Sequence, residues 1–95
     1  MKYRKKPVVV EAWQWDGNLL EDCKDVPQWI WDMEEESDLN LFDDLEPEDR
    51  FIQIETYGVT YDVRPGDYII LDMRGEIHTC SADDFEQTYE EAEHE

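Results

Sequence analysis

Alternating apolar and polar residues mark the second half of this chain as a series of short strands. Residues 51–56 (FIQIET) and 59–63 (VTYDV) both alternate, and Tyr57-Gly58 between them favours a turn, so together they predict a hairpin. The apolar run Tyr68–Leu71 predicts a buried strand, and Glu76–Cys80 predicts another.

Two tight turns separate these later strands. In Arg64–Asp67 proline fixes φ and glycine supplies the positive φ of a type II turn, and Asp72–Gly75 forms the next turn. Near the start of the chain, residues 7–15 (PVVVEAWQW) are rich in β-branched and aromatic residues, and Asp16-Gly17-Asn18 ends them. Because apolar residues fall on both faces, we expect this strand near the middle of the fold.

A short helix is predicted from Asp25 onward. Asp25 can cap it, proline is tolerated in its first turn, and Val26, Ile30 and Met33 form an apolar stripe with Trp29. The anions that follow Met33 disfavour continuation, since carboxylates at a helix C-terminus oppose the macrodipole.

A last helical turn is predicted to open at Ser81, with Asp84 as a capping-box-like partner. Phe85 and Tyr89 would share one face at i, i+4. Residues 90–95, with four glutamates, are expected to fray.

Residues 34–49, the acidic segment, hold nine carboxylates and no cation. Leu39, Leu41, Phe42 and Leu45 interrupt them at near-helical spacing. Two alternatives stay open: a second small helix laid on the core, or an acidic insertion that is a loop and orders only with a partner.

Together these elements predict one α+β domain over residues 1–95, built on a small antiparallel sheet or partly open β-barrel of about five strands with one or two short helices. A chain of this length can enclose a single small core. No segment approaches the roughly 18 apolar residues that span a bilayer, so we expect a cytoplasmic protein.

The charge balance is extreme: 27 Asp and Glu stand against eight Lys and Arg, a net charge of −19. Half of the cations lie in the basic N-terminal head, residues 1–6, so the chain from Pro7 onward carries −23. Direct nucleic-acid binding is disfavoured because phosphate contacts need Lys and Arg. Anionic membranes would also repel this surface.

Catalytic, metal and cofactor chemistry find little support. Cys23 and Cys80 are far apart, without the spacing of a zinc site or a disulfide framework. His78 shares a strand face with Cys80, but a third ligand at metal spacing is missing. No glycine-rich phosphate loop occurs. We therefore expect a non-enzymatic protein that holds no metal or cofactor.

Three ordered motifs carry a family resemblance: KYRKKPVVVEAWQWDG (2–17), PGDYIILDMRGEIHTC (65–80) and ADDFEQTYE (82–90). The chain resembles a widespread family of small phage and prophage proteins in which a Lys-Pro-Val strand, a Pro-Gly-Asp-Tyr turn and a closing Phe-x-x-Thr-Tyr-Glu recur. The resemblance implies a phage origin and a compact, mostly β domain. It implies no catalytic residues, and the acidic segment is longer and more acidic than the family pattern.

These observations lead to one functional hypothesis. An acidic phage protein would bind and inhibit a basic, nucleic-acid-handling host protein (a nuclease, a defence complex or a transcription factor) as a nucleic-acid mimic, acting as a monomer or small homo-oligomer in the host cytoplasm. Carboxylates about 5 to 7 Å apart on helices and strands approximate the charge spacing of a nucleic-acid backbone. The candidate partner-binding residues are Glu34, Glu35, Glu36, Asp38, Asp43, Asp44, Glu46, Glu48, Asp49, Asp83, Asp84 and Glu86, with Trp31, Leu41 and Phe42 as apolar anchors.

Two alternatives come from other functional classes. One is a small-molecule-binding barrel with Trp13, Trp15, Tyr61 and Tyr68 around an aromatic pocket. The other is a virion or assembly accessory protein.

Overall fold

The computed structural model describes residues 10–56 and 58–89. The basic head, the first residues of the predicted N-terminal strand, Tyr57 of the hairpin turn and the tail 90–95 lie outside the described residues. In chain order the elements are β1 (Glu11–Gln14), the 3-10 turn η1 (Leu20–Asp22), α1 (Gln28–Glu35), β2 (Leu39–Phe42), the 3-10 turn η2 (Pro47–Asp49), β3 (Phe51–Thr56), β4 (Val59–Val63), β5 (Tyr68–Leu71), β6 (Ile77–Cys80) and α2 (Ala82–Thr88).

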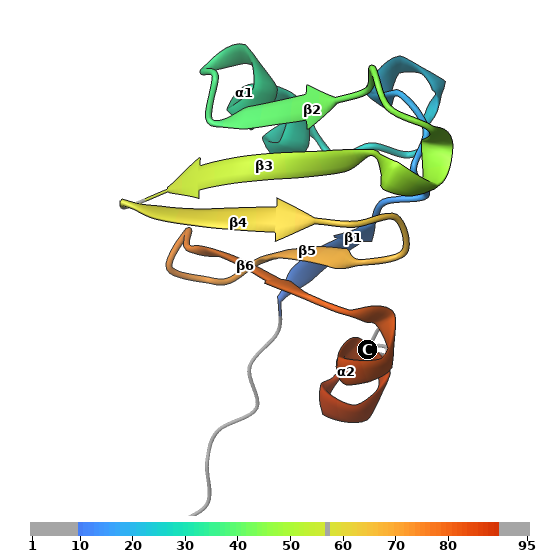
Figure 1. Cartoon of the computed structure of the whole chain (residues 1–95). Helices are drawn as coiled ribbons and strands as arrows, with labels where there is room; N and C mark the ends of the chain where they lie inside the picture. Colours follow the sequence, from blue (N-terminus) through green and yellow to red (C-terminus); the bar gives the residue numbers. More distant parts are fainter. Residues whose placement is uncertain (1–9, 57, 90–95) are drawn as a thin grey trace, which may run out of the picture.

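The described strands form two antiparallel sheets of three strands each, ordered β1-β5-β6 and β2-β3-β4. Strand β4 contacts β6 where the two sheets meet, and α1 packs beside β2 (Figure 1). The α+β prediction is confirmed. The sheets do not close into a barrel, however, and the described residues contain six strands.

The predicted hairpin is present as β3 and β4, and its alternation sets which face is buried. Ile52 and Ile54 are buried while their neighbours are more exposed, and Ile52 lies opposite the buried Val63. Since side chains alternate across a strand, this register directs one apolar face inward. Gly58 in the connecting turn has φ +77°.

Strand β1 lies at the edge of its sheet and not in the middle, so this part of the prediction is wrong. It pairs with β5 alone in the described residues, and Glu11 and Ala12 are exposed. Trp13 is buried on the inner face opposite the buried Ile69. Apolar residues on two faces therefore do not identify a central strand here.

The turn at Pro65-Gly66 joins the two sheets and also holds the end of β1. Gly66 adopts φ +94°, as the sequence predicts, and Asp67 Oδ2 accepts a hydrogen bond from the backbone N–H of Arg64 at 2.9 Å. The Gly66 N–H donates to the carbonyl of Trp15 at 2.7 Å, and the Trp15 N–H donates to the carbonyl of Asp67 at 3.1 Å. These paired bonds fix the position of Trp15.

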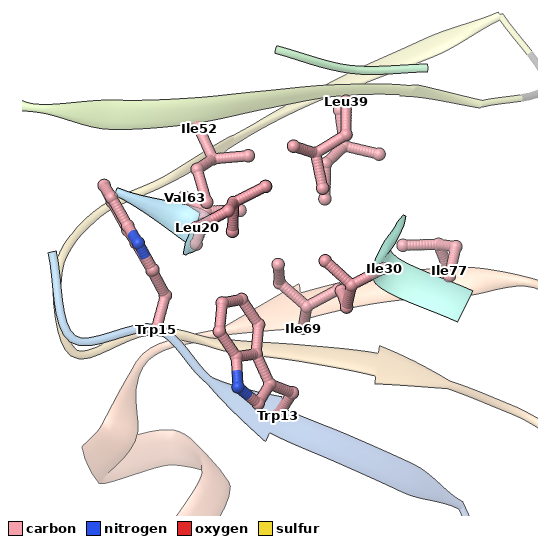
Figure 2. Packing of buried hydrophobic residues seen from close by; sticks show 10 residues of the cluster. Trp13, Trp15, Leu20, Ile30, Leu39, Ile52, Val63, Ile69 and Ile77 are labelled. Carbon is pink, nitrogen blue, oxygen red and sulfur yellow. The ribbon is translucent and has the colours of Figure 1, made fainter. Parts of the chain in front are cut away.

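The hydrophobic core lies between the two sheets (Figure 2). Trp15 is 0% exposed, and its Nε1 donates to the carbonyl of Asn18 at 2.8 Å. Leu20 from η1 and Ile30 from α1 are also buried and complete the cluster. Outside the sheets, the core therefore draws on two segments that connect β1 to β2.

Helix α1 is short, as predicted, but it starts later than expected. Pro27 occupies the N-cap position and Asp25 has φ +57°, without a side-chain cap hydrogen bond. Proline's fixed φ is compatible with a helix start, but its side chain has no acceptor, so α1 begins without a side-chain cap. Glu34 and Glu35 form its last residues, and Ser37 just beyond has φ +66°.

The last helix, α2, follows the prediction. Ser81 caps it, its Oγ accepting a hydrogen bond from the N–H of Asp84 at 3.2 Å. Phe85 stacks on Tyr89 with ring centroids 5.0 Å apart, and on Tyr68 of β5 at 3.8 Å. These stacks attach α2 to the sheet at the end of the molecule away from α1 and β2 (Figure 1).

The acidic segment forms neither a second α-helix nor a single loop: it contains the end of α1, a strand and the 3-10 turn η2. Its residues Leu39–Phe42 form strand β2, paired antiparallel with β3, and Leu39 is 1% exposed. Leu39 and Leu41 lie two residues apart and both pack on the core, because a strand places i and i+2 on one face. The near-helical spacing of the four apolar residues arises because Leu39, Leu41 and Phe42 lie in β2, while Leu45 lies in the exposed connection that follows.

Candidate functional site

A cavity of about 380 Å³ opens among η1, α1 and β2. This volume lies at the lower end of the range of small-ligand pockets. We call it the η1–α1–β2 cavity. The residues that line it are Leu19, Leu20, Glu21, Trp31, Glu34, Ser37, Leu39, Asn40, Leu41 and Asp43.

Local structure explains why these side chains meet. Trp31 and Glu34 are three residues apart on α1, a spacing that puts them on neighbouring positions of one helix face. The turn after α1 reverses the chain into β2, where the Asp38 N–H donates to the carbonyl of Met33 at 2.9 Å. Asp43 follows the last residue of β2. The helix, the reversal and the strand thus form adjoining walls.

The cavity is electrostatically one-sided. Glu21, Glu34 and Asp43 bring three carboxylates to it, all on exposed residues, and its ten lining residues include no Lys, Arg or His. In residues 10–56 and 58–89, the sole contact at ion-pair distance joins Asp72 of the β5–β6 turn to His78 of β6, and it includes no Lys or Arg. The carboxylates at the cavity are therefore not neutralised by any cation of the described part.

An indole lies among these anions. Trp31 is half-buried and packs partly against the core, while also lining the cavity. Leu20 and Leu39 beneath are almost completely buried. The apolar surface that the cavity offers therefore comes from half-buried residues such as Trp31 and Leu41, and it lies beside carboxylates that form no ion pair with a described Lys or Arg.

The predicted partner-binding residues separate into three groups in the structure. Four of them line the η1–α1–β2 cavity: Trp31, Glu34, Leu41 and Asp43. Eight belong to the same segment but do not line it, namely Glu35, Glu36, Asp38, Phe42, Asp44, Glu46, Glu48 and Asp49.

The third group is not brought to the cavity. Asp83, Asp84 and Glu86 lie on α2, at the other end of the molecule (Figure 1). Phe42 also has another environment: its ring stacks on Phe51 of β3 at 4.7 Å, so it is partly engaged in the protein itself. The predicted acidic surface is therefore not one continuous patch.

Sequence reasoning missed six lining residues. Leu39 was recognised as apolar but not as part of a site, and Ser37 and Asn40 carry no distinctive pattern. The remaining three, Leu19, Leu20 and Glu21, belong to a connection whose only sequence signal is the Leu-Leu pair after a turn. Their role depends on η1 folding back toward α1.

The alternative aromatic pocket does not form from the residues expected. Trp13 and Trp15 are buried in the core, and Tyr61 packs against that core. Tyr68 stacks on Phe85. These four side chains are occupied in packing and do not surround the cavity described here.

A second polar cluster lies on the turn between β5 and β6. Asp72, Glu76 and His78 place potential ligand atoms within 4.8 Å of one another, a grouping that the sequence did not predict because His78 was paired with Cys80. Asp72 Oδ1 accepts hydrogen bonds from the N–H groups of Arg74 and Glu76, both at 2.9 Å, and Oδ2 lies 3.0 Å from His78 Nε2. The Glu76 N–H and His78 hold the pKa of Asp72 below its usual value. The cluster thus has a structural role in closing the turn.

Cys23 follows η1 and is a poor nucleophile. The pKa of the Cys23 thiol is raised to about 11, mainly by partial burial. A hydrogen bond from its Sγ to Asp16 Oδ1 at 3.4 Å and the negative charge of that carboxylate raise it further. Burial also raises the pKa of Cys80, with further contributions from Asp84 and Asp67. Because the thiolate is the reactive form, neither residue suits nucleophilic catalysis.

We expect Cys23 to alkylate slowly at neutral pH. With a thiol pKa of about 11 in place of 9.0, the thiolate fraction is about 100-fold lower. Iodoacetamide labelling, followed by mass spectrometry in a Cys80→Ser background, measures the rate against a free cysteine peptide. Asp16→Asn removes the neighbouring charge and should accelerate labelling several-fold. If Cys23 reacted as fast as the free peptide, both with Asp16 present and with Asp16→Asn, the raised pKa of the Cys23 thiol would be contradicted.

Comparisons with protein families, with curated proteins and with solved structures found no match to this chain. The helices in the described part are too short and too polar to cross a membrane.

Proposed function

We propose that this protein is a non-enzymatic binding protein that uses its η1–α1–β2 end to engage and block a basic, nucleic-acid-handling protein of a host cell. The observation that carries the proposal is the η1–α1–β2 cavity, whose charged lining residues are carboxylates alone. A phage origin, with action in the host cytoplasm, is part of the proposal and rests on the family resemblance of the sequence.

Electrostatics supports a basic partner. A surface with this density of like charge attracts cations over long range and speeds association with a basic surface. A groove that binds nucleic acid is lined with arginines and lysines, and the carboxylates of Glu34 and Asp43 would take the place of the phosphates there.

Charge without apolar contact gives little affinity, because exposed ion pairs contribute only modestly. The η1–α1–β2 end also offers Trp31 and Leu41, which are half-buried beside the carboxylates. Aromatic residues that combine with charge in this way are typical of energetically important interface positions. Asp83, Asp84 and Glu86 on α2 do not line the η1–α1–β2 cavity, so the main contact is proposed at the other end of the molecule.

Affinity capture followed by a DNA-binding assay tests the proposal. The tagged protein is used to capture partners from host lysate at low salt, and each partner identified by mass spectrometry is purified. We expect its affinity to fall at least about tenfold between about 50 mM and about 200 mM NaCl. We also expect the protein to displace labelled DNA or RNA from that partner.

A partner whose binding does not change with salt would contradict the electrostatic part of the proposal. A partner that keeps its nucleic acid in the presence of saturating protein would contradict the blocking part. The test variant is a protein with Glu34→Gln and Asp43→Asn, which should displace nucleic acid only at higher concentration.

A further inference from the structure

We propose that the η1–α1–β2 cavity receives an arginine side chain of the basic partner, an inference that rests on the proposed function and specifies its central contact. The occupant is identified by three properties of the cavity: its size, its charge and the indole at its wall.

Size favours a long side chain over a flat surface contact. The volume of about 380 Å³ is large enough for one long side chain, and the half-buried Trp31 and Leu41 offer apolar surface within its lining. The methylene stem of arginine or lysine can pack along apolar surface while its charged end meets polar groups.

Charge selects a cation. Glu21, Glu34 and Asp43 line the cavity, and no described Lys or Arg forms an ion pair with them. An anionic or neutral ligand would leave these carboxylates uncompensated as water is displaced. A cationic side chain is the complement that satisfies them.

The indole and the number of acceptors favour arginine over lysine. A guanidinium is planar, stacks on an aromatic face such as that of Trp31, and presents five N–H donors in a fork that matches carboxylates. Side-chain oxygens of Ser37 and Asn40 add acceptors to the lining. A lysine ammonium is a compact point charge with three donors, so it would use less of this arrangement.

Helix α2 provides an internal control. Asp83 and Glu86 are exposed carboxylates like Glu34 and Asp43, but they do not line the cavity. A pair of neutralising substitutions on α2 changes the net charge by the same amount as a pair at the cavity. The two variants therefore separate a local contact from the overall charge.

The test uses oligoarginine and oligolysine peptides of equal length, titrated into the full-length protein at low salt by isothermal calorimetry. We expect oligoarginine to bind about fivefold to tenfold more tightly than oligolysine. Glu34→Gln with Asp43→Asn should weaken oligoarginine binding about tenfold, while Asp83→Asn with Glu86→Gln should weaken it less than about twofold. Trp31→Leu should remove most of the preference for arginine.

Amide chemical-shift mapping on the unsubstituted, isotope-labelled protein gives a second reading that does not depend on variants. Oligoarginine should shift the Trp31 indole N–H and the amides of Ser37 and Asn40 more than those of α2. Equal affinity for both peptides, or shifts centred on α2, would overturn the inference.

The two proposals can fail separately. If Glu34→Gln with Asp43→Asn and Asp83→Asn with Glu86→Gln weaken oligoarginine binding equally, the inference that the cavity binds arginine is disproved. A partner that is captured at low salt, released at higher salt and displaced from its nucleic acid would still support the proposed function. If neither peptide binds and capture yields no salt-dependent partner, both proposals are disproved.

Discussion

Replacing Trp15 with alanine is expected to lower the free energy of unfolding by about 3–5 kcal/mol, the usual cost of truncating a buried aromatic residue. Trp15 is 0% exposed, belongs to the core cluster that includes residues of both sheets, and donates its indole N–H to the carbonyl of Asn18. Because a domain of this size has roughly 5–14 kcal/mol of stability in total, a large part of it would be lost.

Urea denaturation followed by circular dichroism measures this change. Trp31→Ala is the matched control: it removes the same side chain from a half-buried position, and we expect a loss below about 2 kcal/mol. Equal losses for the two substitutions would show that Trp15 is not the better-buried residue and would contradict the packing in Figure 2.

Replacing Leu39 with alanine is expected to cost about 2–5 kcal/mol, because Leu39 is 1% exposed and β2 is an integral strand. This result would distinguish a segment that is packed on the core of the free protein from the loop that orders only with a partner. A leucine in a loop that orders only with a partner would contribute little to the isolated protein.

The control for Leu39 lies in the same acidic segment. Leu45 is 44% exposed in the connection after β2, and Leu45→Ala should change stability by less than about 1 kcal/mol. Thermal and urea unfolding of both variants at one salt concentration measures the difference. If Leu39→Ala were as mild as Leu45→Ala, the pairing of β2 with β3 would be contradicted.

The outcome for the acidic segment shows why some elements were predictable and others were not. The β3–β4 hairpin and the strands β5 and β6 were predictable because their alternation, turns and short connections are local properties. Residues 34–49 contain four apolar side chains whose spacing fits more than one structure. Only the presence of β3 as a neighbour decides that Leu39 and Leu41 form a strand.

The candidate site was predictable only in part, for the same reason. The sequence indicated that Trp31, Glu34, Leu41 and Asp43 belong to an acidic region with apolar residues, and all four line the cavity. It could not indicate that η1 contributes the remaining wall. Nor could it show that the carboxylates of α2 lie elsewhere, because charge has no periodic signal that reports distance between elements.

The sequence alone determined this protein's charge balance, the segments of β3, β4, β5 and β6, the turns that connect them and the cap of its last helix, because each depends on composition or on residues that are near one another in the chain. The tertiary structure decided which strands pair, that β1 is an edge strand, and that α1, β2 and η1 enclose a cavity. Those features depend on contacts between distant segments, whose energies arise only when apolar faces are buried together.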